Sequence, residues 1–187
     1  MSRREILVVE NNVDDLFFLK RALRSAGVTD SIHSVSDGRA AIACLSGTGD
    51  YADRMQWPMP WLVFLDLKLP YKSGLDVLEY IRSAPDLNRI NVVVVTASED
   101  DKDMKRATEL GVNAYLLKPP TPYVLQRLFA SPQLRPPGDP ADGKRGRSYS
   151  RNPWRYLHDS PREIGWLLLA AAIGVVALLF LVLAALQ

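Results

Sequence analysis

The stretch from Leu62 to Pro70, with the sequence LVFLDLKLP, constrains the fold more than any other part of this chain. Four consecutive apolar residues lead directly into the carboxylate of Asp66. An apolar run of this length is too short for a helix and is typical of a strand buried on both faces. Asp66 is therefore expected at the carboxyl end of a strand. In open α/β sheets, the loops at that edge form a ligand-binding crevice.

Similar apolar runs recur along the chain and alternate with segments of helical periodicity. Besides the strand that ends at Asp66, the expected strands cover residues 6–9, 31–35, 91–98 and 114–118. The expected helices lie near residues 14–27, 38–45, 74–81, 100–110 and 121–130, and a longer loop is expected at 47–60. This alternation predicts an α/β fold with a doubly wound, parallel sheet covered on both faces. Because crossovers are right-handed and ligands bind where the strand order reverses, the tips of the first and third strands should lie side by side.

Polar residues stand at the tips of four of the five expected strands. They are Glu10 and Asn11 at the first, Asp66 at the third, Thr96 at the fourth and Lys118 at the fifth. Each of these residues alone has a structural explanation, such as a loop cap or a solvated charge. Together, the oxygen donors suit a hard cation such as Mg²⁺, while a lysine and a hydroxyl suit phosphoryl oxygens. The set predicts a phosphoryl-acceptor site with Asp66 as the nucleophile.

These motifs carry a resemblance to a known family. Residues 5–130 resemble the receiver domain of two-component response regulators, through the segments VENN (9–12), FLDLKLP (64–70), SG (73–74), VTA (95–97) and LKP (117–119). The segment ENNVDD (10–15) and the long loop before Asp66 are most similar to small single-domain regulators paired with cyanobacterial phytochromes. The expected fold is thus flavodoxin-like, with strand order 2-1-3-4-5, and the receiver domain is expected to cover residues 1–130.

The resemblance also implies a chemistry for the site. A phosphohistidine of a histidine kinase or phosphotransfer protein would donate its phosphoryl group to Asp66. Mg²⁺ would be held by the pair at the first strand tip, Glu10 and Asn11, by Asp66 and by the backbone carbonyl of Lys68.

Three further expectations follow from the same resemblance. Thr96 and Lys118 would bind the phosphoryl oxygens. Tyr115 would be the switch aromatic that rotates inward behind Thr96, and phosphorylation would alter protein contacts on the face formed by Tyr115 and the last two helices. The Lys118–Pro119 peptide would be cis, an isomer that is costly except before proline.

Asn11 departs from the family pattern. Receivers usually carry two acidic residues at the tip of the first strand, and the second of them ligates the metal directly. An amide oxygen can still ligate Mg²⁺, but the site loses one negative charge. We therefore expect weaker Mg²⁺ binding than in an all-carboxylate site, and slower phosphorylation.

The C-terminal part of the chain predicts a membrane anchor. Residues 131–162 are rich in proline and arginine, a composition that cannot bury enough apolar surface to fold, and are expected to form a linker. The 23 residues from Ile164 to Leu186 contain no charge and no proline. As a helix, at about 1.5 Å per residue, they would span roughly 34 Å, enough for a bilayer core of about 30 Å. Residues 163–187 are thus expected to form a transmembrane tail anchor.

The surroundings of this segment predict its orientation and its partners. The basic residues precede the span, so the positive-inside rule places the receiver in the cytoplasm of a single-pass membrane protein. The absence of a signal-peptide pattern at the N-terminus, and a single cysteine, Cys44, agree with a reducing compartment. Ala170 and Gly174 form one small-xxx-small pair, which indicates a possible homodimer. No nucleic-acid partner is expected, because the basic linker is short.

Two alternatives to a phosphorylatable switch stay open. A degenerate receiver would bind partners without phosphorylation, and Asn11 is the residue that motivates this reading. An enzyme with an aspartate nucleophile, similar to haloacid dehalogenase-type phosphatases, would need a second acid two residues after the nucleophile. Lys68 stands there instead. The chain is therefore not expected to be an enzyme.

Overall fold

A computed structural model of the chain describes residues 4–98, 100–132, 134 and 136. The strands are β1 (Glu5–Val9), β2 (Ser31–Val35), β3 (Leu62–Leu65), β4 (Asn91–Thr96) and β5 (Ala114–Leu117). The helices are α1 (Val13–Ser25), α2 (Gly38–Ser46), α3 (Gly74–Ser83), α4 (Asp101–Glu109) and α5 (Pro122–Phe129), with one 3-10 turn, η1 (Gly49–Tyr51). The alternation expected from the sequence is confirmed, with β4 ending two residues earlier than predicted and η1 as an unpredicted turn in the long loop.

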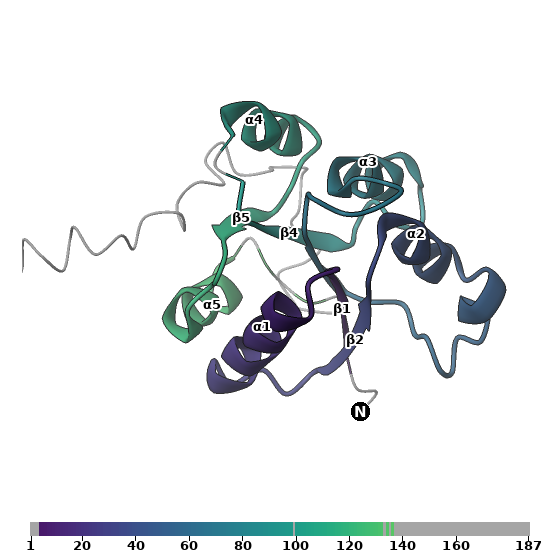
Figure 1. Cartoon of the computed structure of the whole chain (residues 1–187). Helices are drawn as coiled ribbons and strands as arrows, with labels where there is room; N and C mark the ends of the chain where they lie inside the picture. The colour runs from purple at the N-terminus through teal and green to yellow at the C-terminus, as the bar shows by residue number, and fades with distance from the viewer. Residues whose placement is uncertain (1–3, 99, 133, 135, 137–187) are drawn as a thin grey trace, which may run out of the picture. The chain divides into compact units, whose positions relative to one another are not determined.

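The five strands form one parallel sheet in the order β2-β1-β3-β4-β5, as predicted. Helices α1 and α5 cover one face and contact each other, whereas α2, α3 and α4 cover the other face (Figure 1). In the register of the sheet Val9 pairs with Leu65, and Leu65 pairs with Val94. The residues that follow β1 and β3 therefore emerge side by side at the carboxyl edge.

The core explains why the strands are so uniformly apolar. Every residue of β3 and β4 is buried, as expected for central strands with helices on both sides. A large apolar cluster lies between the sheet and the α1/α5 layer; among its members are Ile6, Val8, Leu23, Phe64, Val93, Leu125 and Leu128. This packing holds the sheet, and with it the carboxyl edge, as a rigid platform.

Local signals set the starts of the helices that border the carboxyl edge. The side chain of Asn12 accepts hydrogen bonds from the N–H groups of Asp14 and Asp15, at 2.9 and 3.0 Å, and so caps α1. Ser73 and Asp76 form a reciprocal capping box at the start of α3. Because these caps fix where each helix begins, the side chains of the first turns have defined positions beside the sheet.

The predicted C-terminal elements lie largely outside the described residues. These are the membrane span at 164–186 and the linker beyond residue 136. Within the described part of the chain, no helix is long and apolar enough to cross a bilayer. The linker and the anchor remain predictions from the sequence.

Candidate functional site

Asp66 follows directly on β3 and is 5 % exposed. One carboxylate oxygen, Oδ2, accepts a hydrogen bond from Nζ of Lys118 at 2.7 Å. The other, Oδ1, accepts the backbone N–H of Lys68 at 3.2 Å. Both oxygens are thus held in position by groups from two different loops of the carboxyl edge.

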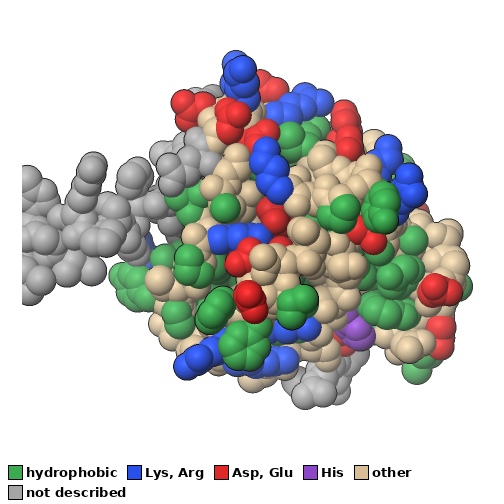
Figure 2. Space-filling model, in the orientation of Figure 1, with side chains coloured by type: hydrophobic (Ala, Val, Ile, Leu, Met, Phe, Trp, Pro, Cys, Tyr) green, Lys and Arg blue, Asp and Glu red, His purple; other side chains and the backbone are tan. Residues whose placement is uncertain are grey.

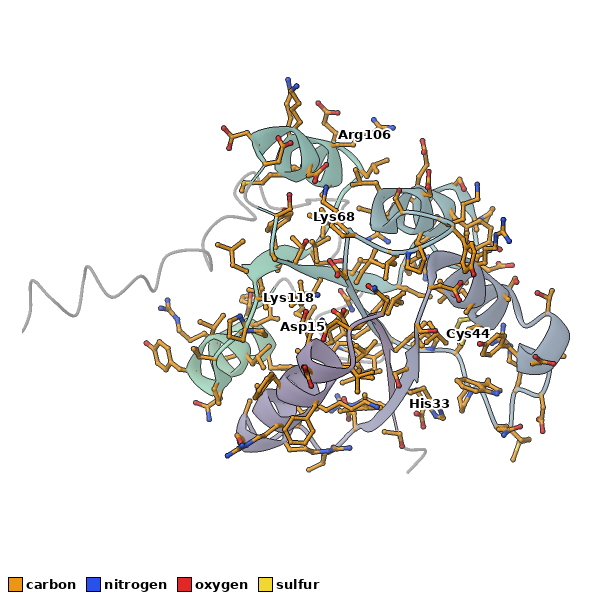
Figure 3. The ribbon with its side chains drawn as sticks, in the orientation of Figure 1. Asp15, His33, Cys44, Lys68, Arg106 and Lys118 are labelled. Carbon is orange, nitrogen blue, oxygen red and sulfur yellow. The ribbon has the colours of Figure 1, made fainter. Side chains whose placement is uncertain are left out.

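Lys118, one residue beyond β5, lies at the centre of the site. Its Nζ contacts Glu10 Oε2 at 2.5 Å and Asp15 Oδ2 at 3.0 Å, in addition to Asp66. Figure 3 shows the labelled side chains of Lys118 and Asp15 close to each other beside the first turn of α1. The Lys118–Pro119 peptide is cis, as predicted. Three carboxylates, from the residues just after β1 and β3 and from the first turn of α1, therefore meet at the ammonium group of Lys118.

The charges of this cluster do not balance. Three carboxylates, those of Glu10, Asp15 and Asp66, surround one ammonium group, which leaves two negative charges in excess. Burial alone would lower the pKa of Lys118, but its hydrogen bonds to Asp66, Glu10 and Asp15 outweigh that effect. The pKa of Lys118 therefore lies well above its ordinary value, and the side chain stays charged. An excess of two negative charges in a half-buried site favours a divalent cation.

The two residues at the tip of β1 lie in different surroundings. Glu10 is 4 % exposed, and its Oε1 accepts the N–H of Asn12 at 2.9 Å. Asn11 is exposed at the start of the loop to α1. The structure thus brings Glu10 and Asp66 each into direct contact with Lys118, while Asn11 is exposed.

Thr96 and Tyr115 lie on β4 and β5, the strands that follow β3 in the sheet. Thr96 is completely buried at the end of β4, and its hydroxyl oxygen accepts the N–H of Ser98 at 3.2 Å. Tyr115 is also completely buried, and its hydroxyl donates to the carbonyl oxygen of Ser98 at 2.8 Å. Burial, followed by the negative charge of Asp103, raises the pKa of Tyr115 to about 12. The predicted switch aromatic therefore lies in the inward position here, tied to the loop that begins at Thr96.

The side chain of Lys68 points away from Asp66 and toward α4. Its Nζ contacts Asp103 Oδ2 at 3.0 Å, and the same oxygen accepts the hydroxyl of Ser98 at 3.0 Å. The hydrogen bond to Lys68 lowers the pKa of Asp103. The backbone of Lys68 is thus part of the Asp66 loop, while its side chain connects that loop to the first turn of α4.

Gly74 lies against the backbone of Asp66 and Leu67. Its N–H donates to the carbonyl of Leu67 at 3.1 Å. A Cβ atom at residue 74 would lie 2.1 Å from the carbonyl oxygen of Asp66, a distance that no real contact allows. Only glycine permits α3 to begin this close to the carbonyl oxygen of Asp66.

Asp15 is the one member of the cluster that sequence reasoning missed. In the sequence, its position in the first turn of an expected helix indicates only a carboxylate that favours the positive end of that helix. A usable signal was present: α1 begins three residues after Glu10, so the first turn of the helix must lie beside the tip of β1. What the sequence does not show is that Asp15 reaches a lysine 103 positions later.

The donor chemistry of the edge fits a hard divalent ion. Mg²⁺ takes one or two carboxylates, carbonyl or amide oxygens and several waters. Of the residues predicted to hold the ion, Glu10 and Asp66 would supply two carboxylates, Asn11 an amide oxygen and Lys68 a backbone carbonyl. In the described part of the chain, no group of three or more His, Cys, Asp or Glu side chains is arranged to hold a metal by itself. Mg²⁺ held by the predicted ligands would also retain waters.

Comparison with known proteins agrees with this geometry. The family model for the response regulator receiver domain matches residues 6–129. Response regulator Rcp1 of Synechocystis is 40% identical over 113 residues, which cover 60% of this chain and 75% of Rcp1. A methanogenesis regulatory protein, FilR2, of Methanothrix harundinacea is 38% identical over 117 residues, which cover 61% of this chain and 71% of the relative.

Solved structures show the same likeness. The phosphorylated cyanobacterial phytochrome response regulator RcpA is similar with a TM-score of 0.60 and 35% identity, over 68% of this chain and 89% of that one. The Mn²⁺-bound form of Rcp1 has a TM-score of 0.60 and 35% identity, over 68% of this chain and 92% of that one. The bacteriophytochrome response regulator AtBRR has a TM-score of 0.64 and 35% identity, over 72% and 94%. With its fold and the match of the family model over residues 6–129, this chain belongs to the response regulator receiver domain family.

Proposed function

We propose that Asp66 accepts a phosphoryl group from a phosphohistidine of a histidine kinase or phosphotransfer protein. In the transfer, the P–N bond of the phosphohistidine breaks as a P–O bond to a carboxylate oxygen of Asp66 forms. The observation that carries the proposal is the contact of Asp66 with Lys118 inside a cluster that has two surplus negative charges. In that setting Asp66 already contacts the ammonium group of Lys118, and the surplus negative charge attracts a metal cation.

Different residues around Asp66 have different roles in the proposed transfer. Lys118, held protonated by its carboxylate partners, lies at hydrogen-bond distance from Asp66 and can bind a phosphoryl oxygen there. Thr96 supplies a hydroxyl at the same edge once the loop bearing Ser98 closes toward Asp66. Mg²⁺ bound by Glu10, Asn11, Asp66 and the Lys68 carbonyl would neutralise phosphoryl charge.

The surface beside the acceptor supports a protein as the phosphoryl donor. Phe17 and Phe18 on α1 are 58% and 51% exposed, and their rings pack edge to face with centroids 5.7 Å apart. Phe18 also lines a pocket together with Glu10, Asp15, Leu19, Val95, Lys118, Pro119 and Pro120. Figure 2 shows hydrophobic side chains gathered around an acidic one over α1. Exposed aromatic rings next to a charged site are typical of a surface that docks another protein.

The response to phosphorylation is a change of protein contacts. A phosphoryl group adds about two negative charges next to a loop that connects Thr96, Ser98 and the buried Tyr115. Rearrangement of this loop would change the face formed by α4, β5 and α5. The sequence of 131–187 adds a linker and a membrane anchor, which would keep this switch at the cytoplasmic side of a membrane.

Labelling with a small phosphodonor tests the acceptor directly. Incubation of the full chain with Mg²⁺ and acetyl phosphate should add one phosphoryl group, detected by intact mass, and Asp66→Asn should remove it. Asp14→Asn is a matched control, since Asp14 is an exposed acid whose side chain lies outside the Lys118 cluster. A wild-type chain that stays unlabelled while a known receiver is labelled would contradict the proposal and favour the degenerate receiver that Asn11 motivates.

Two further measurements address the remaining alternatives. Steady hydrolysis of a generic phosphomonoester, lost in Asp66→Asn, would indicate a phosphatase, and we expect no such turnover because Lys68 stands where an acid would be needed. Membrane fractionation of the full chain and of a chain ending at residue 162 tests the anchor. Loss of the full chain to the soluble fraction would contradict it.

A further inference from the structure

The position of Asp15 has a role beyond the start of α1. Asp15 is the third residue of the helix, and the Asn12 cap holds its backbone N–H. Its carboxylate turns toward the sheet edge and reaches Nζ of Lys118 at 3.0 Å (Figure 3). Asp14, its neighbour in the same turn, is exposed and lies outside that contact. Of two adjacent acids at one helix start, the structure selects one for the acceptor site.

The charge of the site depends on that selection. Asn11, at the tip of β1, is neutral, so the tip of β1 supplies the single carboxylate of Glu10. Without Asp15, Glu10 and Asp66 would face Lys118 with a net charge of −1; with it, the net charge is −2. A divalent cation neutralises the second arrangement and overcompensates the first. The side chain of Asp15 is 36% exposed, so solvent screens its charge only in part.

We infer that Asp15 supplies, from α1, the negative charge that Asn11 does not supply from β1, and so sustains divalent-cation binding at the Asp66 site. This inference rests on the proposed function, because it concerns the same site. The simpler role for Asp15 is a favourable interaction with the helix macrodipole. Asp14 has that role to the same degree, since both acids lie in the first turn.

Cation binding distinguishes the two roles. The full chain is titrated with Mn²⁺, whose free form is followed by electron paramagnetic resonance, and Mg²⁺ is measured by competition. Asp15→Asn should weaken binding about tenfold, as expected for the loss of one charge near a divalent ion in a partly screened site. Asp14→Asn, which removes the same charge one residue away, should change the affinity by less than about twofold.

A second substitution tests the compensation. Asn11→Asp should strengthen binding in the wild-type chain, and in the Asp15→Asn background it should restore the affinity to near the wild-type value. Asp15→Glu, which keeps the charge, should bind nearly as well as the wild type. Thermal unfolding monitored by circular dichroism confirms that each variant is folded.

The outcomes separate this inference from the proposed function. Equal affinities of the wild type and Asp15→Asn, or equal losses in Asp14→Asn and Asp15→Asn, overturn the role of Asp15 while acetyl phosphate labelling of the wild type still stands. Conversely, a chain that binds Mn²⁺ in an Asp15-dependent way but takes no label from acetyl phosphate overturns the acceptor function and leaves the role of Asp15 intact.

Discussion

The two ends of the central sheet both bury a carboxylate, but they balance its charge differently. At the amino-terminal end, Asp30 is 6% exposed; its Oδ1 accepts Nε of Arg4 and its Oδ2 accepts Nε1 of Trp61, each at 3.1 Å. One acid meets one base and one neutral donor. At the carboxyl end, Asp66 shares Lys118 with two other acids.

Arg82 and Asn113, at the same end of the sheet, also have several hydrogen-bond partners. The guanidinium group of Arg82 donates to the backbone carbonyls of Gly111 and Ile90, at 3.0 to 3.1 Å. The side-chain oxygen of Asn113 accepts the N–H of Val92 at 2.7 Å, and its amide donates to Asn91. Closed networks of this kind stabilise a fold. A surplus of like charge does not stabilise a fold, and its presence around Lys118 supports the cation-binding site proposed above.

The largest effect should come from the backbone of the carboxyl end. Gly74→Ala would place a Cβ atom 2.1 Å from the Asp66 carbonyl oxygen, so α3 or the acceptor loop must shift. We expect the free energy of unfolding to fall by about 3 kcal/mol, as for severe overpacking, measured by urea denaturation. A decrease in the free energy of unfolding of less than about 1 kcal/mol would show that this end is loosely packed. The two ends of the sheet would then differ in rigidity as well as in charge.

The next largest effect should come from the amino-terminal end of the sheet. Asp30→Ala leaves the buried indole N–H of Trp61 without its acceptor and removes the partner of Arg4. We expect a loss of about 2 kcal/mol in the free energy of unfolding, with acetyl phosphate labelling of the folded variant unchanged. Labelling that fails in the folded protein would mean that the two ends are coupled, which would break the comparison.

A smaller effect of opposite sign is expected at the acceptor. Asp66→Asn keeps an oxygen that can accept from Lys118 and removes one surplus negative charge. Without metal, the free energy of unfolding should rise by about 1 kcal/mol in urea denaturation. Added Mg²⁺ at ten times its dissociation constant should stabilise the wild type by about 1.4 kcal/mol and the variant by much less. Destabilisation of the metal-free variant would show that the carboxyl end is balanced like the other end.

The smallest effect on stability is expected on the surface of α1. Phe17→Ala should change the free energy of unfolding by less than about 0.5 kcal/mol, because the ring is more than half exposed. Labelling by acetyl phosphate should stay unchanged, while transfer from a histidine kinase that phosphorylates the wild type should slow roughly tenfold, as for loss of an aromatic contact at an interface. Met55→Ala, at a loop residue that is 91% exposed, serves as the control. Equal slowing of both variants would argue against docking at α1.

Most of the fold follows from short-range patterns in the sequence. The unbroken apolar runs of β3 and β4 predict buried central strands, and the alternation with helices predicts a parallel sheet. Element ends shift where capping decides them: Asp100, expected inside a helix, is the N-cap of α4. The turn η1 was missed because a single 3-10 turn leaves no periodic signal in a loop.

The site was predictable only as far as strand tips reveal it. Glu10, Asp66 and Lys118 each follow a strand, so the sheet topology brings them together. Asp15 lies on a helix, and its contact with Lys118 depends on the exact start of α1 set by the Asn12 cap. The inward position of Tyr115 likewise depends on a long-range hydrogen bond to the Ser98 carbonyl, which no local pattern contains.

The close approach of Gly74 to the Asp66 carbonyl also has a mechanical consequence. On the α3 side, the backbone of Asp66 packs so closely against Gly74 that not even a Cβ atom would fit between them. If Asp66 is phosphorylated as proposed, we expect the rearrangement on the opposite side, at Ser98, whose carbonyl accepts the hydroxyl of Tyr115. The tight start of α3 would thereby favour movement of the segment after β4 over movement of α3.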